Sequence, residues 1–283
     1  KDTIEYVFDQ TMDLSGNTDY TLSAWINVPT DTYRLNDSII GFNIKNQPIL
    51  ATFPYLQDFE TNDGFFFSAG RNSSWAYGTP ASPKINHAAS GTKAWKTNLA
   101  GNYNKQETSY LYSPCFDIST LAKPTLSFSL ASDVEVPGTS IYDMAFVEYS
   151  HDGYSWQRLG AAGEGTNWYT NDSAQAWTHT NETYWHVATI PLPQAGSIVS
   201  FRFVLNTDQG SEFEGLAIDD IHIYDLANPI FNQEKFANAI GQNIGAGQSV
   251  SYISDGDIGL HIANGASALG NTEVQAYKHL QFI

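Results

Sequence analysis

The 283-residue chain is long enough for one large domain or two to three small ones, at roughly 100–200 residues per domain. Its 13 Lys and Arg residues against 30 Asp and Glu residues give a formal charge of −17, which repels a phosphate backbone and argues against nucleic acid as a partner. No stretch approaches the roughly 18 apolar residues of a membrane-spanning helix, and 14% aromatic with 15% charged residues is typical of an extracellular β-protein.

Residues 1–50 show the alternation of β-strands. The strand-like runs TIEYVF, YTLSAWINV and SIIGFNI are separated by the turn-rich runs DLSGNT and PTDTYRLND. A free-standing sandwich needs about seven strands over about 100 residues. We therefore expect this segment to be a partial β-domain that ends near Leu50, where Pro48 and Pro54 bracket an extended segment.

Residues 51–227 carry nine short strand candidates between turn signals, which a jelly roll or a similar double-sheet sandwich requires. In the run SFRFVLN, Phe201 and Phe203 share one face and Arg202 lies on the other, so one face of that sheet should be buried. Helical periodicity is nearly absent, and its best candidate, residues 85–95, is interrupted by Gly91. The run SHDGYSW predicts a hairpin with its turn at Asp152.

Residues 228–283 begin with an Asn-, Gln- and Gly-rich stretch and continue with alternating strand candidates. This segment is too short to build a complete core, so we predict a partial C-terminal β-domain, or strands that dock onto the central domain. The predicted fold class is all-β, with a central jelly-roll β-sandwich flanked by partial β-sandwich segments.

Acidic residues lie at both ends of the central domain. Asp58, Glu60 and Asn62 follow its first strand, and Asp219 and Asp220 lie in its last. Because the first and last strands of a jelly roll commonly lie side by side, we expect these oxygens to gather in the hard, oxygen-only environment that suits Ca²⁺. The alternative is that they are solvated turn acids, which are common in so acidic a chain.

Aromatic residues crowd a polar stretch from 167 to 186. Exposed rings can stack on sugars while amides and hydroxyls bind the sugar hydroxyls, so this stretch is the candidate ligand-binding surface. Its residues are Trp168, Tyr169, Trp177, Tyr184 and Trp185. The alternative is that these rings pack against the edge of the sandwich, since most aromatic residues of the chain must be core.

No recognisable catalytic motif is present: the chain lacks HExxH, G-x-S-x-G, P-loop and CxxC patterns. The carboxylates between Glu212 and Asp220 could in principle supply a glycosidase pair, but their spacing differs from the E-x-D-x-x-E run of jelly-roll glucanases. The single Cys115 lies in an alternating strand, where a buried thiol is expected rather than a nucleophile. We predict that this chain is not an enzyme.

The central segment resembles a known family. The resemblance rests on FETNDG at 59–64, the run at 73–104, SYLYSPCFDIS at 109–119, VEYSHDGYSW at 147–156 and EGLAIDDIHI at 214–223. These motifs look like the MAM-like, adhesin-type jelly-roll modules of large secreted or cell-surface proteins of Bacteroidota. The run DLSGNTDYTLSAWINVPTDTYRLND is similar to the C-terminal half of the immunoglobulin-like repeats that precede such modules.

The resemblance implies a structural Ca²⁺ between the first and last strands. The ligands would be Glu60, Asn62 and Asp219 or Asp220, with Asp58 nearby and backbone carbonyls around Lys93 contributing. It also implies that the chain is part of a longer secreted or cell-surface protein, exported by the type IX pathway and carrying further domains.

Our hypothesis from the sequence is a non-catalytic adhesion module, stabilised by calcium, that binds surface glycans or other surface proteins. One alternative is a structural spacer repeat of a surface filament. Another is an accessory module of a secreted protease or glycoside hydrolase.

Overall fold

The computed structural model describes residues 7–16, 19–30, 32–33, 35, 37–135 and 140–227, together with four strands between residues 249 and 282. The chain divides into two compact units, Lys1–Ile49 and Leu50–Ile283. Strands form its regular structure, which confirms the predicted all-β class. Among the described residues, no helix has the length and apolar character needed to cross a membrane.

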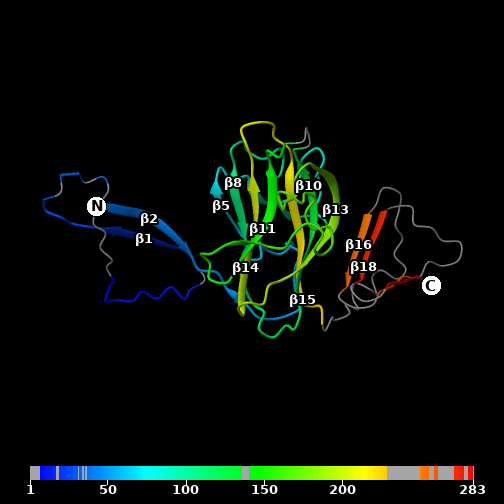
Figure 1. Ribbon diagram of the computed structural model, residues 1–283, viewed down its shortest axis with the longest axis horizontal. Helices are drawn as coiled ribbons and strands as arrows, with labels where there is room; N and C mark the ends of the chain where they lie inside the picture. The colour runs from blue at the N-terminus through cyan, green and yellow to red at the C-terminus, as the bar shows by residue number, and fades with distance from the viewer. Residues whose placement is uncertain are drawn as a thin grey trace. The chain divides into compact units, whose positions relative to one another are not determined.

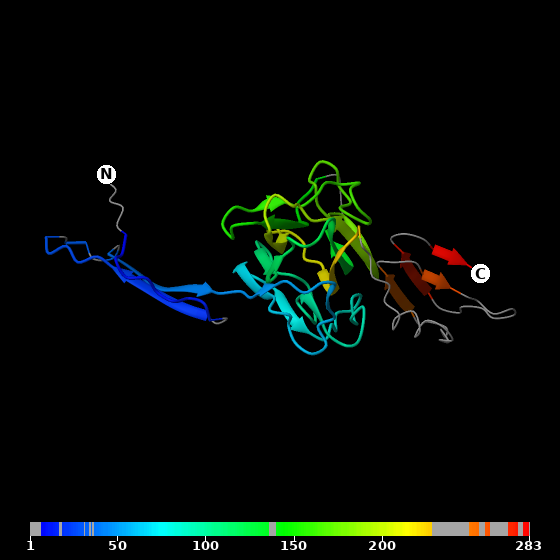
Figure 2. The ribbon, with the colours of Figure 1, turned by 90° about the horizontal axis from the view of Figure 1, so that it is seen from below.

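The N-terminal unit contains one antiparallel strand pair, β1 (Asp19–Trp25) with β2 (Ser38–Lys45) (Figure 2). The ammonium of Lys45 lies 2.9 Å from the carboxylate of Asp19 across this pair. Residues 3–6 of the predicted run TIEYVF lie outside the described residues. The assignment of this unit to an immunoglobulin-like repeat stays a prediction.

The strands from β3 to β15, called here the central unit, form a sandwich of two mainly antiparallel sheets (Figure 1). The first sheet has the order β13-β10-β15-β7-β6, and β4 also pairs with β15. Its strands are β4 (Tyr55–Gln57), β6 (Trp75–Gly78), β7 (Ala94–Thr97), β10 (Pro124–Val134), β13 (Thr180–Pro191) and β15 (Gly215–Asp225).

The second sheet has the order β12-β11-β14-β8-β5; β9 pairs with β14, and β3 pairs with β9. Its strands are β3 (Ile49–Leu50), β5 (Phe67–Arg71), β8 (Thr108–Tyr112), β9 (Cys115–Asp117), β11 (Met144–Ser150), β12 (Gln157–Arg158) and β14 (Ile198–Asn206). The predicted hairpin at Asp152 joins β11 to β12.

One hydrophobic core lies between the two sheets. Leu126, Phe128 and Leu130 of β10 are fully buried, as are Phe201 and Phe203 of β14. The period-two alternation produces this core, because successive side chains of a strand point to opposite faces of its sheet. The outer faces of the sheets are left to carry any functional surface.

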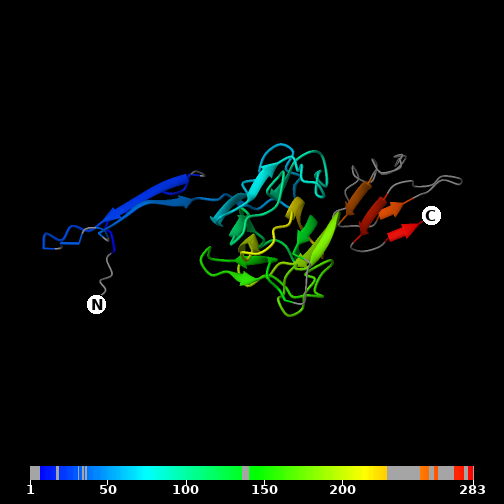
Figure 3. The ribbon, with the colours of Figure 1, turned by 90° about the horizontal axis from the view of Figure 1, so that it is seen from above.

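Towards the C-terminus, β16 (Ser249–Ser254) pairs in parallel with β18 (Asn271–Ala276), and β17 (Ile258–Leu260) pairs in parallel with β19 (Leu280–Phe282) (Figure 3). The remainder of the predicted domain at 228–283 lies outside the described residues. The domain boundaries at residues 50 and 227 stay predictions.

Candidate functional site

β4, which contains the predicted first strand of the jelly roll, lies beside its last strand β15, as the jelly-roll hypothesis expected. β4 pairs with β15, with Ile221 opposite Gln57 and Ile223 opposite Tyr55. This pairing brings the turn that follows β4 next to the two adjacent aspartates of β15. Acidic residues separated by about 160 positions in the chain are thus brought together beside the middle of β15, between its pairings with β4 and β7.

A bulge in β15 turns two successive aspartates towards the same loop. The register of β10 and β15 shifts at Phe128, so that Asp220 and Ile221 together oppose one residue. Asp220 has φ of 47°, the left-handed conformation of the first residue of a G1 bulge. Side chains at adjacent strand positions normally diverge, yet both Asp219 and Asp220 bond to Ser90.

The loop at residues 89–93 closes over these carboxylates. Oδ2 of Asp219 accepts hydrogen bonds from the amides of Ala89 at 2.9 Å and Ser90 at 3.1 Å. Oδ1 of Asp220 accepts a bond from the Ser90 hydroxyl at 2.8 Å. Burial and then the charge of Asp220 raise the pKa of Asp219 to about 8, so the pair resists carrying two negative charges.

Glu60 holds the other end of the same loop. Its Oε1 accepts bonds from the amides of Thr92 at 2.8 Å and Lys93 at 2.7 Å, and these bonds lower its pKa. The Lys93 ammonium donates to the Glu60 carbonyl at 3.0 Å and lies 5.7 Å from the ring centroid of Tyr77. Gly91 is required between them, since a Cβ there would lie 2.2 Å from Cδ of Glu60.

Asp58 and Asn62, the other two predicted ligands, make hydrogen bonds within the turn that follows β4. Oδ1 of Asp58 accepts a bond from the amide of Glu60 at 3.2 Å. Oδ1 of Asn62 accepts bonds from the amide of Gly64 at 2.9 Å and the side chain of Gln57 at 3.2 Å. The structure therefore joins four of the six predicted residues, Glu60, Lys93, Asp219 and Asp220, through one loop. Their role as metal ligands stays a prediction.

The predicted aromatic surface is largely interior, which corrects the expectation of exposed rings. Trp168, Tyr169 and Trp177 are only 3%, 6% and 1% exposed, and they pack in the main core. The indole of Trp168 donates to the carbonyl of Leu159 at 3.0 Å, and the Tyr169 hydroxyl donates to the same oxygen at 2.9 Å. Buried polar ends satisfied by backbone carbonyls let these rings enter the core. These three rings therefore do not form the exposed stacking surface that the sequence analysis expected.

The remaining two predicted rings lie on β13. Tyr184 is 64% exposed, whereas Trp185 is half-buried against the small cluster of Ile85, Ala131 and Ala217. The Trp185 indole donates to the carbonyl of His87 at 3.1 Å.

A polar cavity of about 300 Å³ opens beside the buried rings. Its walls are the loop at 163–170 and the carboxylate-bearing Glu182 of β13. The lining residues are Gly163, Glu164, Gly165, Asn167, Trp168, Tyr169, Thr170 and Glu182. The polar stretch predicted to bind a ligand thus does form a concave site, although its aromatic members contribute chiefly to the wall and the core behind it.

The outer face of the second sheet carries a group of rings and charges that the sequence hypothesis did not single out. It comprises Phe67 of β5, Tyr110 and Tyr112 of β8, Glu148 of β11, Arg202 of β14, and Trp156, which directly precedes β12; we call it the aromatic–arginine surface. Leu111 and Phe203 of the same strands are fully buried, so their neighbours along the strands point to the outer face.

Arg202 is the centre of this surface. Its guanidinium carbon lies 4.2 Å from the ring centroid of Tyr110 and 4.2 Å from that of Trp156. Its Nη1 donates to the Tyr112 hydroxyl at 2.8 Å, and its Nη2 lies 2.6 Å from the Glu148 carboxylate. Cation–π contacts and a charge-assisted bond therefore fix a rigid, half-buried platform.

The sequence did contain a signal for this platform. In SYLYS, tyrosines alternate with the buried Leu111, and in SFRFVLN an arginine alternates with buried phenylalanines. Two aromatic side chains on the outer face of one strand, beside a cationic one on the next, are unusual for a face that meets only water.

The central unit is therefore an all-β sandwich that presents an aromatic and charged outer face. No family model matches the chain. Bacillopeptidase F of Bacillus subtilis (strain 168) is 27% identical over 175 residues, which cover 62% of this chain and 11% of that protein. The matched region is thus a small part of the length of this curated relative.

Solved structures with similarity to the chain include a gingipain domain and a carbohydrate-binding module. The K1 cleaved adhesin domain of Lys-gingipain from Porphyromonas gingivalis W83 shows 17% identity and a TM-score of 0.36, covering 62% of this chain and 99% of that one. CBM27-1 of Caldicellulosiruptor saccharolyticus in complex with mannohexaose shows 17% identity and a TM-score of 0.35, covering 61% and 97%.

Proposed function

We propose that the central sandwich is a non-catalytic carbohydrate-binding module with an adhesive role, and that the aromatic–arginine surface is its ligand site. The observation that carries this proposal is the platform built around Arg202, in which three rings and a carboxylate are fixed on the outer face of a sheet.

The chemistry of this platform suits a glycan. Sugar rings present C–H faces that pack on aromatic rings, and their hydroxyls both donate and accept hydrogen bonds. Arg202 offers donors and Glu148 offers acceptors beside Trp156 and Tyr110. Because the side chains are already ordered by one another, little side-chain entropy is lost on binding.

The exposed ring of Tyr184 and the cavity lined by Glu164 and Glu182 are the competing location for the ligand. That location lies in the polar stretch that the sequence analysis proposed as the ligand site. Tyr184 and Trp185 are its remaining accessible rings. Variants of the two surfaces separate these possibilities.

A glycan microarray probed with the wild-type chain and three variants tests the proposal. Trp156→Ala removes one ring of the platform and should weaken binding by about 1–3 kcal/mol, or roughly 5- to 150-fold. Tyr154→Ala is the matched control, because Tyr154 lies two residues away and is 91% exposed. Tyr184→Ala reports on the competing location.

The proposal fails if Trp156→Ala binds like the wild type while its thermal melt is unchanged. Loss of binding in Tyr184→Ala alone would move the site to the cavity. Absence of any glycan hit for a folded wild-type chain would favour the spacer hypothesis.

We also propose that Ca²⁺ stabilises this module at the loop of residues 89–93, with Glu60, Asp219 and Asp220 as the principal oxygen donors. The support is chemical: two adjacent buried carboxylates repel each other, and a divalent cation would offset that repulsion. Asp58, Asn62 and the Lys93 backbone are the supporting donors in this proposal.

Thermal melting of the EDTA-treated chain, with and without millimolar Ca²⁺, tests this site. A cation that binds only the folded state stabilises it by about 2.7 kcal/mol at a hundredfold excess over Kd. Asp219→Asn should remove the rise in melting temperature that Ca²⁺ binding at this site produces. An equal Ca²⁺ response in the wild type and in Asp219→Asn would contradict the assignment.

A second candidate function is an accessory module of a secreted protease. The observation that favours it is the 27% identity with part of Bacillopeptidase F. Under this hypothesis the longer protein carries a catalytic domain and is exported from the cell. Sequencing the remainder of the gene tests it directly, because a protease domain in the same reading frame is either present or absent.

A further inference from the structure

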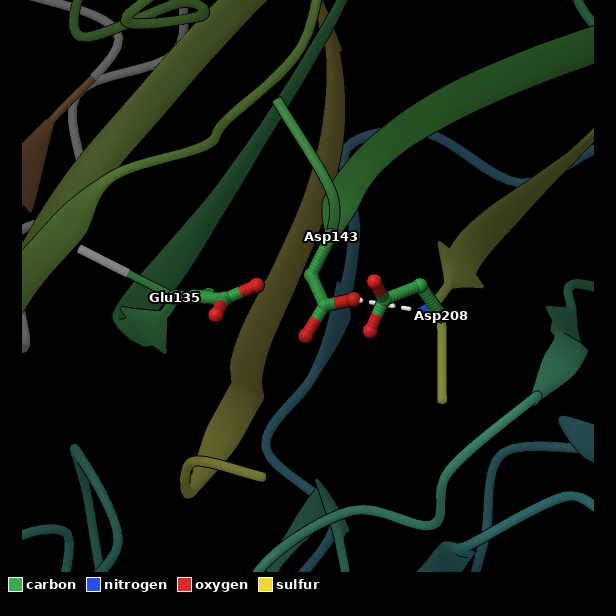
Figure 4. Close-up of side chains that lie close together, drawn as sticks. All are labelled: Glu135, Asp143 and Asp208. Atoms are coloured by element: carbon green, nitrogen blue, oxygen red, sulfur yellow. Dashed lines mark hydrogen bonds between the residues drawn. The ribbon is translucent and has the colours of Figure 1, made fainter. Parts of the chain in front are cut away.

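Three acidic side chains lie together at one end of the central sandwich. Glu135 directly follows β10 of the first sheet, Asp143 directly precedes β11 of the second, and Asp208 follows β14 by two residues. One carboxylate oxygen from each lies within 4.8 Å of the others (Figure 4). The cluster therefore lies where ends of strands from the two sheets approach each other.

Glu135 directs its carboxylate into this cluster, and one of its two oxygens is unsatisfied. Its side chain is 7% exposed, and its buried Oε2 has no hydrogen-bond partner. Figure 4 shows its carboxylate directed towards Asp143. A buried carboxylate oxygen without a partner costs free energy, so this atom indicates a ligand that supplies positive charge.

Asp143 is held rigidly between the other two acids. Its Oδ2 accepts a bond from the Tyr103 hydroxyl at 2.5 Å, and its Oδ1 accepts a bond from the amide of Asp208 at 2.8 Å. Its carbonyl accepts a bond from the Thr178 hydroxyl at 2.7 Å. The donor oxygens are thus positioned in advance of any ligand.

No ion pair among the described residues neutralises the three carboxylates. Burial and the neighbouring carboxylates raise the pKa of Glu135, and the nearby His179 lowers it only in part. Burial is also the largest cause of the raised pKa of Asp143. The cluster concentrates negative charge at a partly buried site, and this charge attracts a cation.

We propose that Glu135, Asp143 and Asp208 bind a divalent metal ion of the Ca²⁺ class. Three carboxylates provide hard oxygen donors without nitrogen or sulfur, and Ca²⁺ completes its shell of six to eight oxygens with carbonyls or water. This site is distinct from the loop at residues 89–93. Along β10, Glu135 is six residues beyond Ser129, the partner of Asp219, which is about 20 Å.

A cation here would couple the sandwich to the loop that borders the polar cavity. The segment after Trp177 is already fastened to this end of the sheets: Thr178 bonds to Asp143, and the amide of Val134 donates to the Thr180 hydroxyl at 3.1 Å. The ion would lock the ends of β10, β11 and β14 against one another.

Isothermal titration of the EDTA-stripped full chain with Ca²⁺ tests the proposal. Glu135→Gln preserves the shape of the side chain and removes its charge, so it should weaken one binding event by at least about tenfold. Asp172→Asn is the matched control, because it removes one exposed charge from the surface. Asp219→Asn should leave this event intact, which separates it from the calcium site of the proposed function.

If Glu135→Gln does not fold, Asp208→Asn replaces it, since Asp208 is less buried. A crystal soaked in Tb³⁺ should show an anomalous peak about 2.3–2.6 Å from the three carboxylates. The proposal is overturned if no such peak appears, or if Glu135→Gln titrates like the wild type.

Discussion

Replacement of Trp177 by Ala distinguishes a core residue from a ligand-binding one. Trp177 is 1% exposed, and its ring centroid lies 5.2 Å from that of Trp168, 4.9 Å from that of Tyr169 and 6.1 Å from that of Phe128. Its removal leaves a cavity among these rings, which fill the core too tightly to collapse fully. We expect the free energy of unfolding to fall by about 3–5 kcal/mol.

Denaturant unfolding followed by near-ultraviolet circular dichroism measures this change. At roughly 2–4 °C per kcal/mol, the melting temperature should fall by about 6–20 °C. Tyr184→Ala, in the same predicted aromatic stretch but 64% exposed, should change stability by less than about 0.5 kcal/mol. A loss below about 1 kcal/mol for Trp177→Ala, or equal losses for the two variants, would refute the core assignment.

Three further predictions follow from single residues. Gly91→Ala should destabilise the chain by about 1–3 kcal/mol in denaturant unfolding, because φ is +56° and the new Cβ would collide with Glu60; unchanged stability would contradict the packing of that loop. Lys96 is fully buried and its pKa is lowered to about 8 from 10.5, chiefly by burial, so the unfolded chain holds more protons between these values. The contribution of Lys96 to stability should therefore rise by about 3 kcal/mol as the pH increases from 8 to 10.5, measured as the difference between the stability profiles of the wild type and Lys96→Met. Burial raises the pKa of the half-buried Cys115 thiol, so a thiol reagent at pH 8 should modify the folded chain more slowly than the unfolded chain; equal rates would contradict this prediction.

The sandwich itself could be predicted because alternation is a local signal. Phe201 and Phe203 are buried and Arg202 lies on the other face, as the run SFRFVLN indicated. The pairing of the first and last strands also followed from the jelly-roll hypothesis. These features depend on the period of a strand and on general topology, both of which can be inferred from sequence.

The environment of the aromatic stretch could not be predicted in the same way. Polar neighbours suggested exposure for Trp168 and Tyr169, yet both bond to the carbonyl of Leu159 and enter the core. The bulge at Asp220 likewise has no signal in the local sequence, because it arises from the register between two strands that are far apart along the chain. Such features depend on contacts between segments far apart in the chain.

The acidic cluster is the clearest case of a site without a local signal. Glu135, Asp143 and Asp208 belong to different strand ends, and no spacing rule connects them. Only the packing of the two sheets brings them together. The aromatic–arginine surface was predictable only in part. Its strand alternation is visible in the sequence, but the contact of Tyr110 with Arg202 depends on the register of β8 and β14.

Nuclear magnetic resonance of the glycan complex tests the proposed binding surface most directly. The wild-type chain would be titrated with the glycan that scores highest on the array, while the indole N–H of Trp156 and the Nε–H of Arg202 are observed. We predict that both signals shift in proportion to saturation and that the Trp177 indole stays unchanged. Shifts confined to Trp185 and the residues around the polar cavity would contradict the account.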